Sequence, residues 1–202
     1  MTNSLASSKA SDLVILGYST GAGALVLFLT INGASGIPEV VSIVTACLIA
    51  IGLLVPAGGM LQMRRGIRPI QHDERNGFAM QGLGLIGLLL AVVLVVATSS
   101  LLGYLVSALI IAISGGSALL GAIFLKKYYK GIAALRNRDA WYFVLGTALI
   151  FSGVGLIAAS NIAYQYFISQ VENTVYVDVG ATISACGWAR AAHAYYTLRD
   201  RN

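Results

Sequence analysis

The stretch from Val40 to Met63 constrains the fold of this chain most strongly, because it holds no charged residue. At about 1.5 Å per residue, a helix of that length crosses the roughly 30 Å of hydrocarbon in a bilayer. Arg64 and Arg65 follow directly, and such cations are typical of the cytoplasmic end of a span. The sequence therefore predicts a membrane-spanning helix here.

The composition extends this prediction to the whole chain. Hydrophobic residues make up 57% of the 202 residues and charged residues only 10%, whereas soluble domains are about 25% charged. We therefore expect an integral membrane protein surrounded by lipid. Its net charge of +5 is explained below by topology, and we predict no nucleic-acid partner. Cys47 and Cys186 lie in separate apolar runs and imply no disulfide framework.

Apolar runs of similar length recur along the chain. The first is longer than the core of a signal peptide and lacks a convincing basic leader, so we interpret it as a span. We predict an all-α membrane protein that forms one integral membrane domain over residues 1–202. Its six transmembrane helices are expected at about 13–31, 40–63, 78–98, 102–125, 141–160 and 176–198.

The second and fourth spans are similar in sequence. A shift from residue 46 to residue 108 places residues 46–51 over 108–113, and the arginines at 64–65 over the lysines at 126–127. A fainter third copy ends at Arg199. Two interpretations stay open: a chance likeness between helices rich in Ala, Leu and Ile, or a repeat that makes the bundle three helical hairpins.

Basic residues indicate the orientation in the membrane. Every Lys and Arg except Arg190 lies near the termini or in segments 64–75 and 126–139, which six spans place on one face. Because Lys and Arg concentrate in short cytoplasmic loops, we predict cytoplasmic N and C termini and a multi-pass location in the cell inner (plasma) membrane. Tyr and Trp residues near the span ends fit interfacial aromatic belts.

Motifs that carry chemistry are scarce. Residues 82–87 match G-x-G-x-x-G, but they lie inside an apolar span without the strand and acidic residue of a dinucleotide site. We interpret these glycines as helix-packing positions. Residues 72–75, His-Asp-Glu-Arg, are adjacent and cannot all converge on a metal ion, so we expect a solvated loop. The sequence thus predicts no catalytic residue, no metal and no cofactor, and a protein that is not an enzyme.

The predicted sixth span is the most polar. At about 100° per residue its polar residues share one stripe: Asp178, Thr182, Cys186, Arg190 and His193. Ionisable residues inside a span are costly and are therefore candidates for function, either lining a pathway or meeting a partner. The alternative is structural, because Arg190 lies only about 13 Å from Arg199 and its side chain can extend toward the interface.

A second polar group lies at the end of the fifth span. Asn161 and Gln165 share a face with Thr147. They are candidates for the outer mouth of a pathway, and the alternative is that they mark the membrane interface.

The residues that open the predicted spans follow a pattern seen in a known family. Odd spans open with an aromatic residue and then glycine, as at residues 141–146 and in Phe78 with Gly82, and residues 37–42 open an even span. This pattern resembles the HdeD family of small six-helix bacterial membrane proteins. The resemblance implies an inner-membrane protein linked to acid-stress resistance and supplies no catalytic residue. A fainter pattern, Gly58-Gly59 with Gln62, is similar to the acetate-uptake transporter family.

Three functions follow from these observations. The leading hypothesis is a structural or interaction scaffold, either a homo-oligomer or an accessory subunit of a larger membrane complex. The alternative is a channel or transporter for a small solute or anion, with Arg190 and His193 on a polar face of the sixth span. An enzyme acting on lipid or quinone would need a convergent polar site, which these two residues only begin to provide.

Overall fold

The computed structural model describes residues 3–32, 39–67, 71–98, 100–131 and 136–199. These residues form six helices, and no strand occurs among them. In chain order the helices are α1 (Asn3–Asn32), α2 (Glu39–Gly66), α3 (His72–Ala97), α4 (Leu101–Gly131), α5 (Asn137–Tyr164) and α6 (Gln170–Arg199). The all-helical class predicted from the sequence is confirmed.

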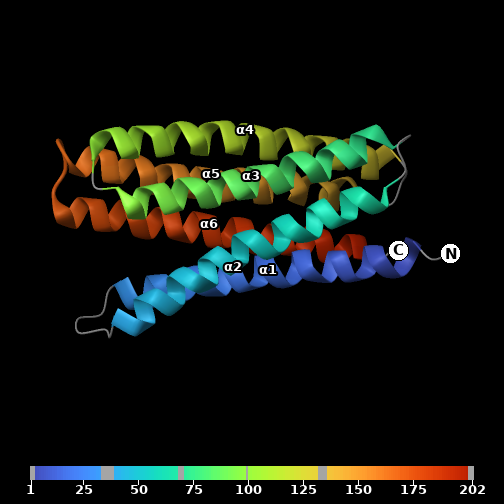
Figure 1. Ribbon diagram of the computed structural model, residues 1–202, viewed down its shortest axis with the longest axis horizontal. Helices are drawn as coiled ribbons and strands as arrows, with labels where there is room; N and C mark the ends of the chain where they lie inside the picture. The colour runs from blue at the N-terminus through green and yellow to red at the C-terminus, as the bar shows by residue number, and fades with distance from the viewer. Residues whose placement is uncertain (1–2, 33–38, 68–70, 99, 132–135, 200–202) are drawn as a thin grey trace.

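The helices form a closed ring in which each one packs against its two neighbours in sequence, and α6 closes the ring on α1. The most extensive contacts lie within the pairs α1–α2, α3–α4 and α5–α6, so the bundle consists of three hairpins. α1 begins and α6 ends at the same end of the bundle, as Figure 1 shows. The α1–α2 hairpin is inclined to the other four helices and diverges from them at the opposite end (Figure 1).

Five of the helices are long and apolar enough to cross a membrane: α1 over Lys9–Ile31, α2 over Val40–Gly66, α3 over His72–Val95, α4 over Leu101–Gly131 and α5 over Asn137–Tyr164. α6 has 30 residues but is more polar than the others, and it is not among these five. The chain is thus a multi-pass helical membrane protein, and the crossing by α6 stays a prediction.

Glycines allow the helices to approach closely. A Cβ at Gly21 of α1 would overlap the ring of Trp188 from α6, and one at Gly17 would overlap Pro56 of α2. In the G-x-G-x-x-G segment, Gly84 and Gly87 of α3 lie against α4. Their role in helix packing, predicted from the sequence, is confirmed.

Two helices begin earlier than predicted. Residues 72–75, expected as a solvated loop, form the first turn of α3, and α6 begins at Gln170, six residues before the expected start of the sixth span at about residue 176. The start of α6 is fixed by a capping box, in which the backbone N–H and hydroxyl of Ser169 both donate to Glu172 Oε2 at 2.8 Å. The Glu172 backbone N–H donates in return to Ser169 Oγ at 3.3 Å.

Candidate functional site

Aromatic side chains fill the inside of the helix ring in the half where α1 begins and α6 ends. Phe143 makes an edge contact with Tyr195, with ring centroids 5.1 Å apart, and is stacked on Tyr129 at 5.9 Å. Tyr18 lies 6.0 Å from Tyr195 and 6.2 Å from Trp188. All five rings are buried. Phe78 of α3, which is also buried, lies 6.3 Å from Tyr195. Because every helix except α2 contributes an aromatic side chain, this aromatic column holds helices on opposite sides of the bundle together.

A chain of hydrogen bonds crosses the centre beside this column. The Tyr195 hydroxyl donates to Gln81 Oε1 at 2.6 Å, and Gln81 Nε2 donates to Thr147 Oγ1 at 3.2 Å. The Thr147 hydroxyl donates to the backbone carbonyl of Phe143 at 2.8 Å. Buried polar groups need such partners, so this network fastens α3, α5 and α6 across the ring.

The sequence interpretation missed Gln81 and Tyr195. Gln81 is an amide within an otherwise apolar run, and a polar residue inside a span is a signal that could have singled it out. Tyr195 gave no such signal, because a tyrosine near a span end is equally typical of an interfacial belt. Its hydroxyl instead points inward to Gln81.

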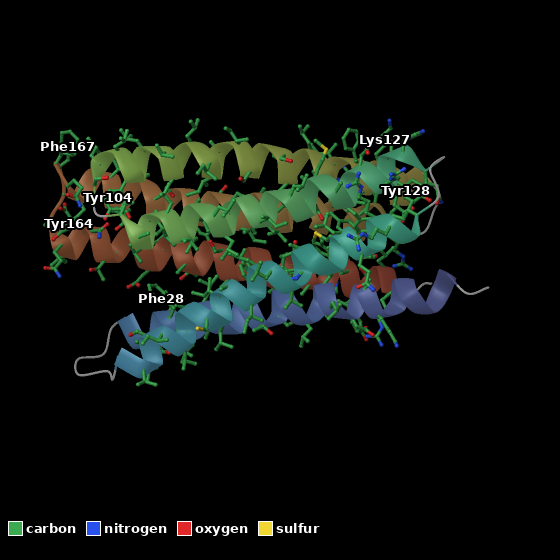
Figure 2. All side chains as sticks on the ribbon, in the orientation of Figure 1. Phe28, Tyr104, Lys127, Tyr128, Tyr164 and Phe167 are labelled. Atoms are coloured by element: carbon green, nitrogen blue, oxygen red, sulfur yellow. The ribbon has the colours of Figure 1, made fainter. Side chains whose placement is uncertain are left out.

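Charged and phenolic groups join the helices at the end where α1 begins. Arg199 Nη1 of α6 lies 2.7 Å from Asp12 Oδ1 of α1, and Lys127 Nζ lies 3.6 Å from Asp73 Oδ2. The Tyr129 hydroxyl donates to Glu74 Oε1 at 2.5 Å. Figure 2 places Lys127 and Tyr128 at this end and Tyr104, Tyr164 and Phe167 at the other. Aromatic residues therefore lie at both ends of the bundle, as the sequence predicted.

The polar stripe of α6 lies on the outside of the bundle. Thr182, Cys186, Arg190 and His193 are exposed and Asp178 is half-buried, while the opposite face of α6, with Ser184, Trp188 and Tyr195, is buried in the ring. The stripe residues therefore share a face, as predicted, but that face is turned away from the interior of this chain.

Arg190 and His193 both rest on Tyr142 of α5. The guanidinium carbon of Arg190 lies 5.2 Å from the Tyr142 ring centroid, and the His193 ring makes an edge contact with it at 5.2 Å. The ion pairs formed by the described residues do not include Arg190. The hydroxyl of Thr182, by contrast, is satisfied within its own helix by the Asp178 carbonyl at 2.8 Å.

The polar residues Asn161, Gln165 and Thr147 of the fifth span lie in different surroundings in the structure. Asn161 Oδ1 accepts a weak hydrogen bond from Asn173 Nδ2 at 3.4 Å, and Gln165 is exposed where α5 ends. Thr147 belongs to the buried network farther along the helix. Asn161 thus contacts the first turn of α6, whereas Thr147 lies farther along α5, away from Asn161.

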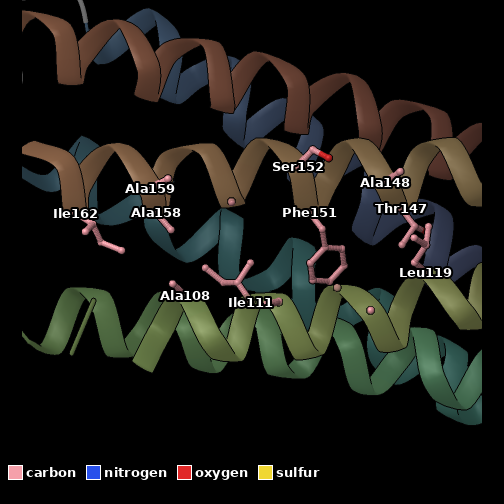
Figure 3. A pocket seen from close by; sticks show the side chains of 14 residues that line it. Ala108, Ile111, Leu119, Thr147, Ala148, Phe151, Ser152, Ala158, Ala159 and Ile162 are labelled. Atoms are coloured by element: carbon pink, nitrogen blue, oxygen red, sulfur yellow. The ribbon is translucent and has the colours of Figure 1, made fainter. Parts of the chain in front are cut away.

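A cavity of about 420 Å³ lies between α4 and α5. Its walls are mainly small residues, and the ring of Phe151 lies in the space between the two helices, as Figure 3 shows. Ala112, Gly116 and Ser152 at its rim are exposed, whereas Ile111 and Thr147 at its floor are buried. The cavity is therefore a groove that opens to the outside of the bundle.

No family model, curated protein or solved structure matches this chain. The fold and its side chains alone therefore define the class of protein, a multi-pass helical membrane protein with an aromatic interior.

Proposed function

We propose that this protein is a non-enzymatic scaffold of the inner membrane, an accessory subunit that binds another membrane protein through the outer face of α6. The observation that carries the proposal is the direction of the polar stripe. The most polar helix of the bundle turns Arg190 and His193 outward, where lipid or a neighbouring protein must meet them.

An uncovered Arg190 would be costly in lipid. An arginine at the centre of a span costs about 2.5–3.5 kcal/mol on insertion scales, and a cation–π contact such as that with Tyr142 offsets about 0.5–2 kcal/mol of it. Extension toward the interface lowers the cost further. A partner that supplies a carboxylate would satisfy the guanidinium by charge-assisted hydrogen bonds.

The positive charge of Arg190 favours a different protein, and not a second copy of this chain, as the partner on the α6 face. In a symmetric pair of parallel α6 helices, Arg190 of one copy would face Arg190 of the other, and like charges repel. A transmembrane helix that carries Asp or Glu at the depth of Arg190 is the complementary partner. The acid-stress role implied by the HdeD resemblance belongs to this proposal as its physiological setting.

The transport alternative has less support from the geometry. The aromatic column occupies the interior of one half of the ring, and the α6 stripe lies outside it. A pathway lined by Arg190 and His193 would have to run between this bundle and a neighbouring one.

The test is extraction of the protein from native membranes in mild detergent, followed by native gel separation and mass spectrometry. We expect the wild-type chain to migrate with a second membrane protein that has an Asp or Glu in a span. Arg190→Gln should lose that protein, while Arg138→Gln, which removes an exposed cation at the same end, should keep it.

Two results would contradict the proposal. A band that contains this chain alone, at its own mass or at a multiple of it, would exclude a partner protein. Retention of the same partner by Arg190→Gln would show that the α6 face is not where it binds.

A further inference from the structure

A cation lies about two helical turns beyond the lining of the groove between α4 and α5. Lys126 follows the lining residue Leu119 by seven residues, and Trp141 precedes the lining residue Ala148 by seven. Seven residues are about two helical turns, so each residue lies on the groove-facing side of its own helix. Lys126 Nζ lies over the Trp141 ring, 3.0 Å from its centroid.

The dimensions of the groove suit one hydrocarbon chain. Along α4 its walls run from residue 108 to residue 119, a rise of about 16 Å at about 1.5 Å per residue. One leaflet contributes about half of the roughly 30 Å hydrocarbon thickness. Along the axis of α4, Leu119 lies about 10 Å and Ala108 about 27 Å from Lys126, so the groove begins in the leaflet of the Lys126–Trp141 pair and extends past the middle of the bilayer.

The groove is lined by small, mainly apolar residues and has few polar groups. Gly115, Gly116 and Gly155 leave the two helix backbones without side chains along the groove, and a Cβ at Gly116 would meet no atom within 4 Å. The hydroxyl of Thr147 at the floor is already donated to a backbone carbonyl. Recognition inside the groove is therefore apolar, and the charged group of any occupant must lie at the mouth.

We propose that the α4–α5 groove binds an anionic phospholipid, with the terminal part of one acyl chain in the groove and the phosphate beside Lys126. Trp141 orients the ammonium group and supplies the amphipathic ring that is typical of the headgroup level. Other cations at this end, Lys130 and Arg138, are exposed and favour anionic over zwitterionic headgroups through their field. The site lies on the side of α5 away from Arg190 and is independent of the partner proposed above.

The proposal predicts selective lipid retention. The probe is the purified full chain in nanodiscs of phosphatidylcholine that contain phosphatidylglycerol, released into native mass spectrometry to count the lipids that stay bound. We expect wild-type protein to retain phosphatidylglycerol in preference to phosphatidylcholine. Lys126→Gln should reduce that preference by about fivefold, the effect of about 1 kcal/mol for one cation near a membrane surface.

A second variant tests the groove itself. Gly116→Leu places a side chain in the groove and should abolish the retained phosphatidylglycerol. Two control variants should retain it as the wild type does: Lys9→Gln, an exposed lysine of α1, and Gly23→Leu, a glycine of α1 whose Cβ also meets no atom within 4 Å. Equal retention by Gly116→Leu and wild type, or equal retention of both lipids by the wild type, would overturn the proposal.

Discussion

The two sides of α5 differ although both are built from small residues. Toward α6, a Cβ at Gly146 would lie 2.7 Å from the backbone nitrogen of Ala191, and one at Gly187 would lie 2.6 Å from that of Ile150. The two backbones are therefore in contact along this seam. Toward α4, residues of the same kind line an open groove of about 420 Å³.

The difference comes from what lies opposite each small residue. In the α5–α6 seam a glycine of one helix faces the backbone of the other, which is how small residues allow close packing in membranes. At Gly115 of α4 the facing group is the ring of Phe151, whose atoms lie 2.9 Å or more from the position of an added Cβ. The Phe151 ring lies between two helix faces made of small residues. It holds α4 and α5 apart and leaves space on both sides of the ring. Small residues thus allow close packing between α5 and α6, whereas between α4 and α5 they line an open groove.

The largest effect is expected in the seam. Gly187→Ala should lower the free energy of unfolding by about 3 kcal/mol, the upper end of overpacking costs, because the added methyl group meets backbone atoms that cannot rotate away. Gly116→Ala in the groove should be neutral or stabilising by up to about 1 kcal/mol, since alanine favours the helix. Denaturation of both variants in detergent measures the difference, and equal destabilisation would contradict the contrast between the two sides.

An intermediate effect on the free energy of unfolding is expected in the buried hydrogen-bond network, which includes Thr147 at the floor of the groove. Gln81→Leu removes the acceptor of the Tyr195 hydroxyl and the donor to Thr147, and an unpartnered buried polar group costs about 1–3 kcal/mol. Tyr195→Phe should cost a similar amount because it leaves Gln81 Oε1 unpaired. The double variant should cost less than the sum of the two, and strict additivity would show that the bond contributes nothing.

The smallest effect is expected at the far end of the seam, where α6 begins. Hydrogen bonds from the backbone and hydroxyl of Ser169 lower the pKa of Glu172 below its ordinary value. These bonds therefore stabilise the first turn of α6 above the unfolded-state pKa of this carboxyl, and the stabilisation is lost as the pH falls through the lower folded-state pKa.

Hydrogen exchange of the amides at residues 170–174, corrected for intrinsic rates, should rise at acid pH. Glu172→Gln should flatten this dependence, because glutamine can also complete a capping box but does not titrate. An unchanged pH profile in Glu172→Gln would assign the dependence to other groups.

The sequence predicted the parts of this structure that depend on local composition. Uncharged runs such as Val40 to Met63 located the helices, and periodicity placed Arg190 and His193 on one face. Periodicity cannot say which way that face turns, because the answer depends on whether α6 packs by its polar stripe or by Gly180, Ser184 and Gly187.

The buried network and the groove lay beyond prediction for a similar reason. Gln81 and Tyr195 are 114 residues apart, and only the closed ring brings them together. The groove arises from the position of Phe151 between two glycine-rich faces, and its opening depends on an interhelical distance that no local pattern encodes.

The most direct test of the proposed partner-binding face uses the exposed thiol of Cys186, which lies in the α6 stripe. In native membranes, Cys47→Ser leaves Cys186 as the single thiol for a cross-linker with one thiol-reactive end and one photoreactive end, and Cys186→Ser leaves the exposed Cys47 of α2 as the control. We predict an adduct only from Cys186, with the linked peptide mapping to an Asp- or Glu-bearing span of another protein. An adduct at twice the mass of this chain, or none from Cys186, would contradict the account.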